Sequence, residues 1–529
     1  MPQGQNMPEV QQIQNQTAQQ RNIMVAKLVA AVVRTTLGPK GMDKMLVDSM
    51  GDVTVTNDGV TILREMTLDH PTAKMMVEIA KTQEIEVGDG TTTAVILAGE
   101  LLRNAEQLLY KKIHPTIIAK GYKLAAAEAM NILYNMAQSI SPKDKDTLIK
   151  IAQTAMTGKG AEDARDKLAE VVVESVLKIA SGNQIDLNDI KIETKSGAST
   201  EDTEIVEGIV MDKQKAHPNM PEVMVKARIA LIDAQLELKD VQMDAKININ
   251  SPVDMQAFID AEAQIIKTLV DKIITTGANV VFCTRNIDDA AVHFMARAGI
   301  MAFKRCNRED LEKLSKATKA KIVTDISEMT KEDIGSAGKV EEVRVGLNLM
   351  TFVRECTDAK SVTILVRGST DQVASEAKRA IEDALGDLAA IIKDGKAVGG
   401  AGAPEMILSK ELSIFAKKHP GRIQLAIEAF ARSLESIPET LAENAGLDPI
   451  DILTELRAAS SFYGDSPDIA WPGVNVFTGK IMNSWKEGVI EPLRVKTQAV
   501  SSAAEVATMV LRIDDVISIM KNPNDLQQK

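Results

Sequence analysis

Hydrophobic positions recur at intervals of three and four residues over long stretches of the chain, which is the period of an amphipathic helix. Ile23, Met24, Leu28, Val32 and Val33 follow this period and predict a helix over residues 17–36. The same pattern predicts helices over 72–86, 92–110, 115–137, from 145 onward, 372–388, 405–418, 424–434, 438–445, 449–459 and 496–520. The two ends of the chain are therefore expected to be mainly helical.

The middle of the chain has a different pattern, in which short apolar runs alternate with charged helical segments. Strands are predicted at 230–232, 280–283, 299–303 and 321–323, and helices at 252–274, 288–298 and 308–318. This alternation is typical of a parallel α/β unit. Further strands are predicted at 190–192, 207–210, 362–368 and 472–476, with a proline-containing linker at 214–221. Because an α/β segment separates two helical ends, we expect one domain inserted in another, with both ends packed together.

Two turn signals interrupt these patterns. Residues 53–56 alternate like a strand, Asn57-Asp58-Gly59 is a strong turn signal, and apolar positions continue at 60–63. This arrangement predicts a β-hairpin. Residues 488–492 are also expected to form a turn.

One glycine-rich loop carries the clearest candidate chemistry. Gly88-Asp89-Gly90-Thr91-Thr92-Thr93 precedes an apolar helical run. Glycine lets the backbone approach a ligand closely, and the free amides and dipole at a helix start attract anions. Asp89 repels phosphate but can hold a divalent cation that bridges to phosphate oxygens. The loop is therefore consistent with a phosphate and magnesium site, or with a plain helix start capped by Asp89 or a threonine. The loop alone leaves both readings open.

Two other glycine-containing loops are ambiguous when taken alone. Leu37-Gly38-Pro39-Lys40-Gly41 ends the first predicted helix, and the simple helix-stop interpretation is favoured over a nucleotide contact. Lys159 stands between two glycines, where a solvated loop lysine is favoured over a sensor of a terminal phosphate. No GxxxxGK[ST] motif occurs, so the chain is not a P-loop NTPase.

Composition narrows the class of protein. The 529 residues suggest about three or four domains. They are 45% hydrophobic but only 3% aromatic, so the cores must be built from aliphatic residues and methionine. A net charge of −12 argues against nucleic acid as the main partner. No apolar run approaches the roughly 18–20 residues that a membrane span needs, so no membrane partner is expected.

The termini and the cysteines bear on location. The Gln-rich N-terminal stretch has no hydrophobic core segment, so we expect a disordered arm and no signal peptide. Three widely separated cysteines favour a reducing cytoplasm over disulfides or a zinc site. The five histidines show no metal-ligand spacing.

Several segments, taken together and in order, resemble the group II chaperonins, specifically the archaeal thermosome type. They are TTLGPKGMDKMLVD at 35–48, VTNDGVTILREM at 55–66, VGDGTTTAVILAGELL at 87–102, PEVMVKARIALID at 221–233, EDAL at 382–385 and GVIEPLRVKTQAVSSA at 488–503. A single glycine loop is weak support, whereas this series spans essentially the whole chain.

The resemblance implies a multidomain α and α/β fold with three domains. A mainly helical equatorial domain from both termini (1–145 and 403–529) would bind ATP and make ring contacts. A small α/β intermediate domain (146–213 and 368–402) would act as a hinge. An inserted α/β apical domain (214–367) would bind unfolded protein. Its helical protrusion, which we place near 252–274, would serve as a built-in lid, so no separate lid protein is expected.

The resemblance also implies roles for single residues. Asp89 matches the magnesium ligand, and Asp58 and Asp383 match the carboxylates that position and activate the attacking water. Lys159 resembles the lysine that senses the γ-phosphate. The remaining implied nucleotide contacts are Leu37, Gly38 and Pro39 in the first loop, Gly90, Thr91, Thr92 and Thr93 at the phosphates, Gly400 and Gly402 in the second glycine loop, and Asn475 and Glu491 at the ribose and base. ATP and Mg²⁺ are the implied cofactors.

The chain departs from the family pattern at one position. The family's glycine triplet reads Gly400-Ala401-Gly402 here, and the methyl group of Ala401 limits backbone freedom near the base. The implied partners are non-native protein clients and copies of the chain itself, in stacked rings of eight or nine subunits. A kinase using the same phosphate loop and a non-hydrolysing scaffold are the alternative functions.

Overall fold

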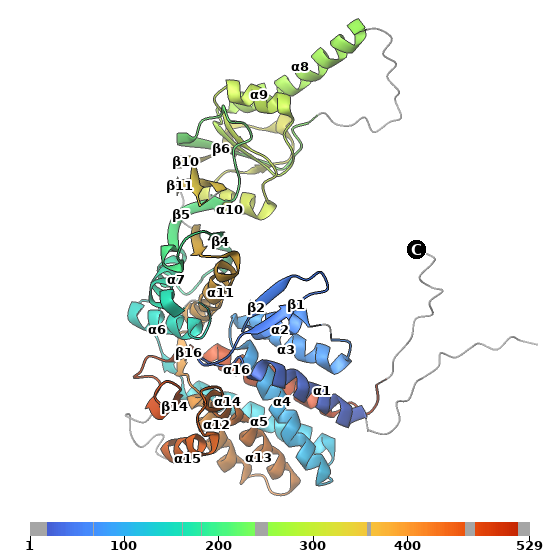
Figure 1. The fold of residues 1–529 in the computed structure, drawn as a ribbon, viewed down its shortest axis with the longest axis vertical. Coiled ribbons are helices and arrows are strands. Elements are labelled where there is room, and N and C mark those ends of the chain that lie inside the picture. Colours follow the sequence, from blue (N-terminus) through green and yellow to red (C-terminus); the bar gives the residue numbers. More distant parts are fainter. Residues whose placement is uncertain are drawn as a thin grey trace, which may run out of the picture. The chain divides into compact units, whose positions relative to one another are not determined.

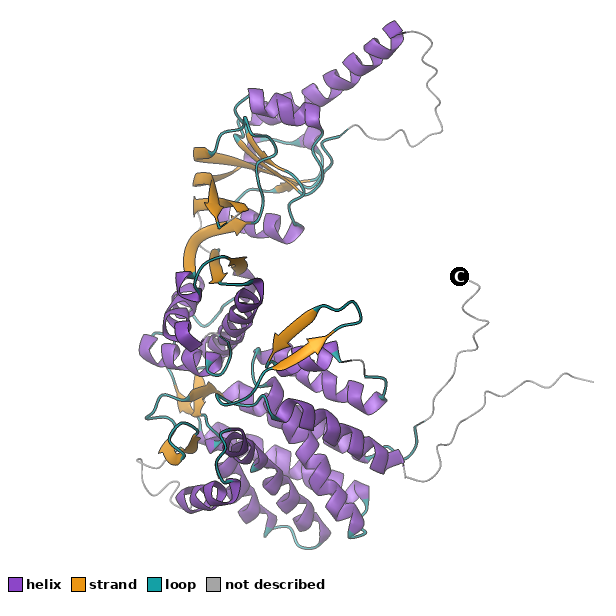
Figure 2. Cartoon of the chain, viewed as in Figure 1, coloured by secondary structure: helices purple, strands orange, loops and turns teal. Residues whose placement is uncertain are grey.

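The computed structural model describes residues 18–66, 68–160, 162–180, 182–237, 252–346, 348–356, 361–460 and 471–516. It divides into two compact units. The first unit joins the two ends of the chain, residues 1–162 and 382–529, and the second comprises 163–381. Helices make up most of the first unit, whereas a sheet with helices against it makes up the second (Figures 1 and 2).

The first unit is a helical bundle arranged around α4. Its helices are α1 (Ala18–Arg34), α2 (Gly59–Glu65), α3 (Pro71–Val87), α4 (Thr91–Tyr110), α5 (Pro115–Met136), α6 (Lys145–Met156), α12 (Ala403–Ala416), α13 (Arg422–Leu434), α14 (Ser436–Asn444), α15 (Pro449–Ser460) and α16 (Leu493–Leu511). Every residue of α4 from Thr93 to Leu102 is buried, because α1, α3, α13 and α16 all pack against it. One apolar core contains residues from both ends of the chain, so the expected packing of the two ends is present.

Residues 53–65 depart from the predicted hairpin. β2 (Val53–Thr56) pairs antiparallel with β1 (Lys44–Val47), which precedes it in the chain. The segment after Asp58 is the helix α2, and the Asp58 carboxylate caps it by accepting from the Thr61 backbone amide at 2.8 Å. The predicted strand at 60–63 is wrong because Asp58 acts as a helix N-cap, a role that an Asp-Gly turn signal does not exclude.

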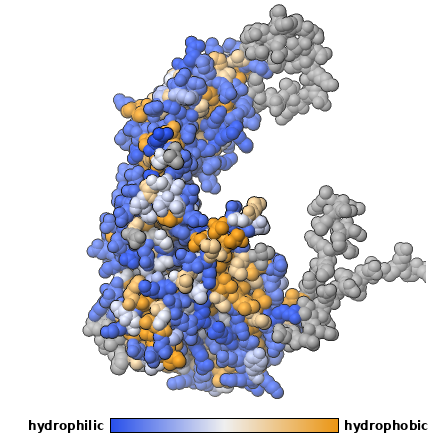
Figure 3. Space-filling model, viewed as in Figure 1, coloured by the Kyte–Doolittle hydropathy of each residue, from blue (hydrophilic) through white to orange (hydrophobic). Residues whose placement is uncertain are grey.

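The β1–β2 hairpin has an unusually apolar surface. Met42, Met45, Val47 and Met50 are 63–88% exposed. Figure 3 shows apolar residues gathered over this hairpin. Exposed apolar patches of this kind mark interaction sites.

Two small sheets join distant segments of the first unit. β13 (Lys396–Gly399) pairs with both β16 (Ile490–Pro492) and β3 (Gln138–Ser139). β14 (Pro472–Asn475) forms a hairpin with β15 (Lys480–Asn483). The predicted turn at 488–492 therefore ends in a strand, which brings Glu491 beside Val398.

The second unit contains a nine-stranded mixed sheet in the order β4-β12-β5-β11-β10-β6-β7-β8, with β9 paired to β6. The strands are β4 (Ile190–Ser196), β5 (Glu204–Met211), β6 (Val223–Ile232), β7 (Val280–Cys283), β8 (Met301–Phe303), β9 (Ile322–Val323), β10 (Gly335–Val345), β11 (Asn348–Cys356) and β12 (Val362–Gly368). Its helices include α7 (Arg165–Ile179), α8 (Pro252–Thr276), α9 (Asp289–Arg297) and α10 (Arg308–Thr318).

The parallel α/β prediction holds for only part of this sheet. β6, β7, β8 and β9 are parallel, as the alternating pattern indicated. β10 and β11 form a long antiparallel hairpin that also pairs with β6 and β5, and it was not predicted. Charged residues in β10 leave no continuous apolar run there, whereas β11 carries the apolar stretch 349–353, interrupted only by Thr351, and was not assigned.

The remaining differences concern helix limits. α7 was not predicted, and α16 ends at Leu511 although a helix was expected to 520; residues 512–516 are not helical, and the rest of that range lies outside the described residues. The N-terminal arm also lies outside them. α11 (Asp371–Asp394) contains the division between the units, at Ile381–Glu382. Among the described residues, no helix combines the length and apolarity that a membrane crossing requires.

Candidate nucleotide site

The glycine loop 88–90 connects the end of α3 to the start of α4. Gly88 and Gly90 both have left-handed backbone conformations, with φ values of 92° and 80°. The Nε2 of the buried Gln83 donates to the carbonyl oxygen of Asp89 at 2.9 Å and to that of Val495 at 3.2 Å, which fixes the loop. No side chain caps the α4 N-terminus. Its first amides are therefore left to bind an anion, as the phosphate interpretation requires.

Asp58 lies against this helix start. The hydroxyl of Thr91 donates to one Asp58 carboxylate oxygen at 3.4 Å, while the other oxygen caps α2. A Cβ built on Gly59 would lie 2.7 Å from the Thr92 hydroxyl oxygen, so these segments are in close contact. The fold thus brings Asp58 beside the loop that carries Asp89, which the sequence alone could not decide.

Lys159 joins two of the candidate carboxylates. Its Nζ lies 3.0 Å from the Asp89 carboxylate and 2.5 Å from that of Asp383 on α11. The three side chains are 19–26% exposed, so solvent and ligands can reach them. The structure therefore brings together three predicted site residues from distant segments of the chain. Lys159 and Asp383, for example, are 224 positions apart in the sequence.

Electrostatics distinguish these three groups. Burial opposes charge on each of them. For Asp89, Lys159 and the Gly90 amide outweigh burial, and the pKa is lowered. For Lys159, burial is outweighed by Asp383 and Asp89, so its pKa is raised and it stays protonated. For Asp383, burial dominates over Lys159, the Asp89 charge adds to it, and the pKa is raised to about 8. At neutral pH Asp89 is the ionised carboxylate, and Asp383 is the one that holds a proton.

Asp387 is a further acidic residue at this site that the sequence reasoning missed. It lies one turn after Asp383 on α11, is 1% exposed, and its Oδ1 atom has no hydrogen-bond partner. Burial raises its pKa well above the usual value, and the Asp89 charge adds to the effect. The i, i+4 spacing from Asp383 places both on one helix face and was available in the sequence.

The second glycine loop connects β13 to α12. Gly402, with a φ of 79°, precedes α12. Ala401 has a φ of 58°, so its backbone adopts the left-handed conformation that residues with a side chain avoid. The amide of Gly400 donates to the Val489 carbonyl oxygen at 2.8 Å. A Cβ on Gly400 would lie 2.5 Å from a Glu491 carboxylate oxygen, so Glu491 borders this loop. Its role as a nucleotide contact stays a prediction.

Glu491 also belongs to a buried ionic cluster that was not predicted. Lys496 Nζ lies 2.7 Å from the Glu491 carboxylate and 3.0 Å from that of Glu405. The Lys496 and Glu405 side chains are 6% and 2% exposed. Burial raises the pKa of Glu491. The charge of Lys496 opposes this increase in part, and the charge of Glu405 adds to it.

Asn475 has its side-chain oxygen occupied in this structure. The Oδ1 atom accepts from the amides of Phe477 and Thr478, both at 3.0 Å, and so shapes the β14–β15 turn. Its side-chain amide group stays the candidate contact for a ribose or base. Its strand touches the second glycine loop, since the Val474 amide donates to the Ala401 carbonyl oxygen at 3.0 Å.

The first nucleotide loop lies against the Lys159 loop. A Cβ on Gly158 would lie 2.8 Å from Pro39 Cα and 2.9 Å from the Gly38 carbonyl oxygen. The Asn57 side-chain amide donates to the Gly158 carbonyl oxygen, which ties the Lys159 loop to the segment before Asp58. The loops containing Gly38, Asp58, Asp89 and Lys159 thus meet at one place within the first unit.

The residues present fit a magnesium–nucleotide complex. Asp89 supplies an ionised carboxylate oxygen, the ligand type that Mg²⁺ takes beside phosphate oxygens. The uncapped α4 amides and the protonated Lys159 supply positive charge for phosphates. The unpartnered Asp387 Oδ1 is a buried acceptor with nothing to accept, as expected at a site that is completed by a ligand or water.

Comparisons with known proteins identify the family of the chain. The model of the TCP-1/cpn60 chaperonin family matches residues 29–521. The chain is 55% identical over 501 residues to a thermosome subunit beta of Methanothermobacter thermautotrophicus, covering 95% of this chain and 92% of that protein. It is 54% identical over 517 residues to a thermosome subunit of Methanopyrus kandleri, covering 97% and 94%.

A solved structure gives the same result at the level of the fold. The open-state monomer of a group II chaperonin from Methanococcoides burtonii matches with a TM-score of 0.61 and 42% identity, over 81% of this chain and all of that one. The chain belongs to the TCP-1/cpn60 chaperonin family, and within it to the group II chaperonins of the thermosome type.

Proposed function

We propose that this chain is an ATP-dependent chaperonin subunit whose hydrolysis of Mg–ATP drives the enclosure and folding of non-native proteins in a double ring. The contact of Lys159 with both Asp89 and Asp383 is the observation that carries the proposal. A charged lysine that links a candidate metal ligand to a candidate catalytic carboxylate suits a site that must neutralise and release a terminal phosphate. Family membership supports the same conclusion.

The proposed chemistry is hydrolysis by positioning and charge neutralisation. Magnesium bound at Asp89 would withdraw charge from the phosphate oxygens, and the α4 amides would bind them. Lys159 would leave Asp383 for the γ-phosphate when nucleotide enters. Once Asp383 has released its proton to solvent, its carboxylate and that of Asp58 would orient the attacking water and accept a proton from it. Leu37, Gly38 and Pro39 would bound the nucleoside on one side, and Gly400, Gly402, Asn475 and Glu491 on the other.

Coupling to movement follows from where Asp383 stands in the chain. It is the second residue of the first unit after the division at Ile381–Glu382, in the middle of the continuous helix α11. A displacement of α11 would therefore carry Asp383 toward or away from the nucleotide. We propose that hydrolysis requires this displacement and that the same motion closes the chamber, with α8 as part of a built-in lid.

The apolar β1–β2 hairpin supports self-association. Met42, Met45, Val47 and Met50 are too exposed to stabilise the isolated subunit, and the paired strands present backbone edges that a second copy can extend. We propose that this hairpin contributes to contacts within rings of eight or nine subunits, in a cytoplasmic assembly that needs no separate lid protein.

One experiment tests the proposal against both alternatives. The purified chain is imaged by electron microscopy with and without Mg–ATP, and phosphate release is measured without any acceptor molecule. Stacked rings that change shape with Mg–ATP, together with phosphate release, are expected. A monomer that forms ADP only when a small-molecule acceptor is added, with the phosphoryl group on the acceptor and no free phosphate, would indicate a kinase. Rings without hydrolysis would indicate a scaffold.

A further inference from the structure

The helix α14 touches both loops that are proposed to hold the nucleoside. A Cβ on Gly38 would lie 2.3 Å from Leu441 Cδ2, and one on Gly402 would lie 2.8 Å from Pro438 Cβ. Leu441 and Pro438 are both buried residues of α14. Because both loops rest on this one short helix, a movement of α14 would shift them together.

The end of α14 also holds the backbone of the first loop directly. The side-chain amide of Asn444 donates to the Leu37 carbonyl oxygen at 2.9 Å and to the Arg34 carbonyl oxygen at 3.1 Å. Arg34 is the last residue of α1, so Asn444 spans the step from the helix end to the loop. Satisfying two helix-end carbonyl groups in this way fixes where α1 ends and the loop begins.

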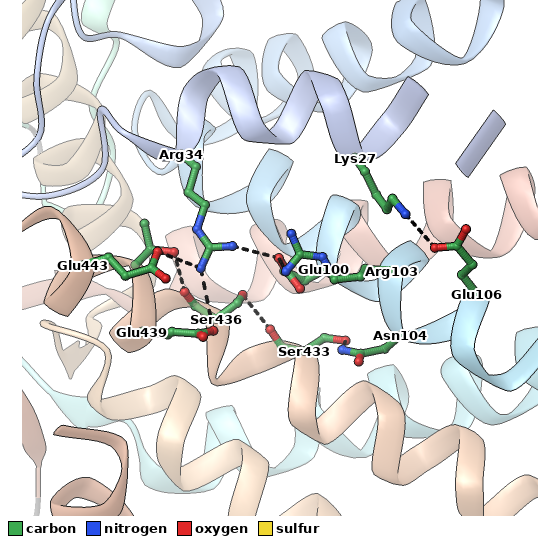
Figure 4. Close-up of polar contacts among 11 residues, drawn as sticks. Lys27, Arg34, Glu100, Arg103, Asn104, Glu106, Ser433, Ser436, Glu439 and Glu443 are labelled. Atoms are coloured by element: carbon green, nitrogen blue, oxygen red, sulfur yellow. Dashed lines mark hydrogen bonds and ion pairs between the residues drawn. The ribbon is translucent and has the colours of Figure 1, made fainter. Parts of the chain in front are cut away.

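The guanidinium of Arg34 connects α14 to the phosphate helix α4. It lies 3.1 Å from the Glu100 carboxylate on α4 and 3.0 Å from that of Glu443 on α14, with Glu439 at 3.7 Å. We call Arg34 and these three glutamates the Arg34 junction; Figure 4 shows the guanidinium between the carboxylates. The Arg34 side chain is 17% exposed and that of Glu100 is 12% exposed.

Charge balance makes the junction sensitive to loss of Arg34. Three carboxylates surround it. Arg103 adds a positive charge 3.0 Å from Glu100, and the charge of Arg457 acts on Glu439. Burial raises the pKa of Glu100, the two arginines oppose this, and Glu439 and Glu443 add to the increase. Without Arg34, Glu100 would keep its ion pair with Arg103 but would lose the cation that it shares with Glu439 and Glu443, and repulsion among the three carboxylates would push α14 away from α4.

We propose that Arg34 and Asn444 are positioning residues for nucleotide binding, which set the separation between the phosphate helix α4 and the two nucleoside loops through α14. The inference deepens the proposed function, because it assumes that the loops at 37–39 and 400–402 hold ATP. It predicts an effect on nucleotide affinity and KM, with little effect on the chemical step, since Asp383 and Lys159 lie outside the junction.

The chain offers a matched control on the same pair of helices. Lys27 on α1 pairs with Glu106 on α4 at 2.6 Å, with side chains 30% and 19% exposed. This pair joins α1 to α4 as Arg34 does, but Lys27 lies about two helical turns before Arg34, away from the Arg34 junction (Figure 4). Loss of Lys27 therefore reports what a weakened α1–α4 contact does by itself.

The test compares R34M, K27M, R34K, N444A and the double variant E439Q/E443Q with the unaltered chain. The affinity for a fluorescent N-methylanthraniloyl derivative of ADP with Mg²⁺ is measured, together with KM and kcat for ATP. We expect R34M and E439Q/E443Q to weaken binding and raise KM about tenfold, as expected for misplaced binding loops, with kcat within about threefold. N444A should show a smaller change in the same direction, R34K a partial one, and K27M none.

Other outcomes are equally informative. If R34M fails to fold, E439Q/E443Q and N444A still decide the question, because they alter partly exposed side chains of α14. Unchanged affinity in those variants, or an equal loss in K27M, would overturn the positioning role. If the unaltered chain binds no Mg–nucleotide, the proposed function itself fails, and that result is distinct from the first two.

Discussion

Lys159 and Lys496 each contact two carboxylates in the same unit, yet their surroundings differ. The Lys496 side chain is 6% exposed and its partner Glu405 is 2% exposed. Lys159 and its partners are 19–26% exposed and come from three separate segments of the chain. A cluster that is closed to solvent can hold structure, whereas one that is open can exchange partners. The comparison indicates that the Lys496 cluster stabilises the structure of the site and that the Lys159 cluster changes ion-pair partners during nucleotide binding and hydrolysis.

Replacing Lys496 should have the largest effect. K496M would leave the buried Glu405 (2% exposed) and the partly exposed Glu491 (18% exposed) without their cation, and breaking a buried pair such as Lys496–Glu405 costs about 3–5 kcal/mol. Urea unfolding can be followed by the fluorescence of Trp471 and Trp485, which stack 6.1 Å apart in the same unit. K159M is the control and should lose hydrolysis with a much smaller loss of stability. Equal destabilisation by both variants would remove the distinction between the two clusters.

Replacing Asp383 should affect chemistry alone. D383A should bind Mg–ATP and hydrolyse it at least about a hundredfold more slowly, because a positioned base is lost. Single-turnover phosphate release, with nucleotide binding measured separately, provides the check. Turnover at the normal rate would exclude Asp383 from the reaction, and its ion pair with Lys159 would then have no role in hydrolysis.

Replacing Asp89 should affect the metal. D89A should bind Mg–ADP about tenfold more weakly or worse, because the anionic magnesium ligand is absent, while metal-free ADP should be less affected. Titrations of the protein with ADP in the presence of Mg²⁺ and in the presence of EDTA measure the affinities for Mg–ADP and for metal-free ADP separately. Tight magnesium-dependent binding by D89A would place the metal elsewhere.

Ala401 tests the fine geometry beside the Lys496 cluster. Its φ of 58° is strained for alanine, so A401G should stabilise the first unit by about 1 kcal/mol. The same tryptophan-detected unfolding measures this change, and A403G, inside the start of α12, is a control that should destabilise. A stability loss in A401G would mean that the methyl contact outweighs the strain.

Proton release should give the smallest signal. Burial raises the pKa of Asp383 to about 8, so at pH 7 the free protein holds this proton. Magnesium that binds with ADP would lower the pKa of Asp383, so that at most about one proton should be released from each site on binding. The release should fade as pH rises above about 8, where the carboxylate is already ionised. Calorimetry in buffers of different ionisation enthalpy measures it, and D383N should abolish most of it.

Local signals predicted much of the site. Local turn and cap signals marked the loops at 37–39, 57–59 and 88–90 as interruptions between elements. The proposed nucleotide roles of these loops came from the order of the family motifs. The helices of both ends followed from their apolar period. β10 was missed because its charged residues interrupt the apolar pattern, and β11 was not assigned although its sequence is largely apolar. α2 was misread because Asp-Gly suits both a turn and a helix cap.

Contacts between distant segments were beyond these signals. Nothing near Arg34 in the sequence indicates Glu443, and nothing near Lys496 indicates Glu405, yet the fold pairs them. Asp387 was within reach, since it follows Asp383 by one helical turn, but its importance depends on burial that only the packed structure creates. The three-domain boundaries and the lid assignment of α8 remain predictions.

The sequence by itself determined the helical ends, much of the α/β middle and the family, because periodicity, capping and motif order can be read along the chain. Only the tertiary structure decided which charges meet. Ion pairs between residues hundreds of positions apart depend on how helices pack, and packing energy is a property of the whole core. For that reason Lys159, which looks like an ordinary loop lysine in its local sequence, is found in the structure to link Asp89 and Asp383.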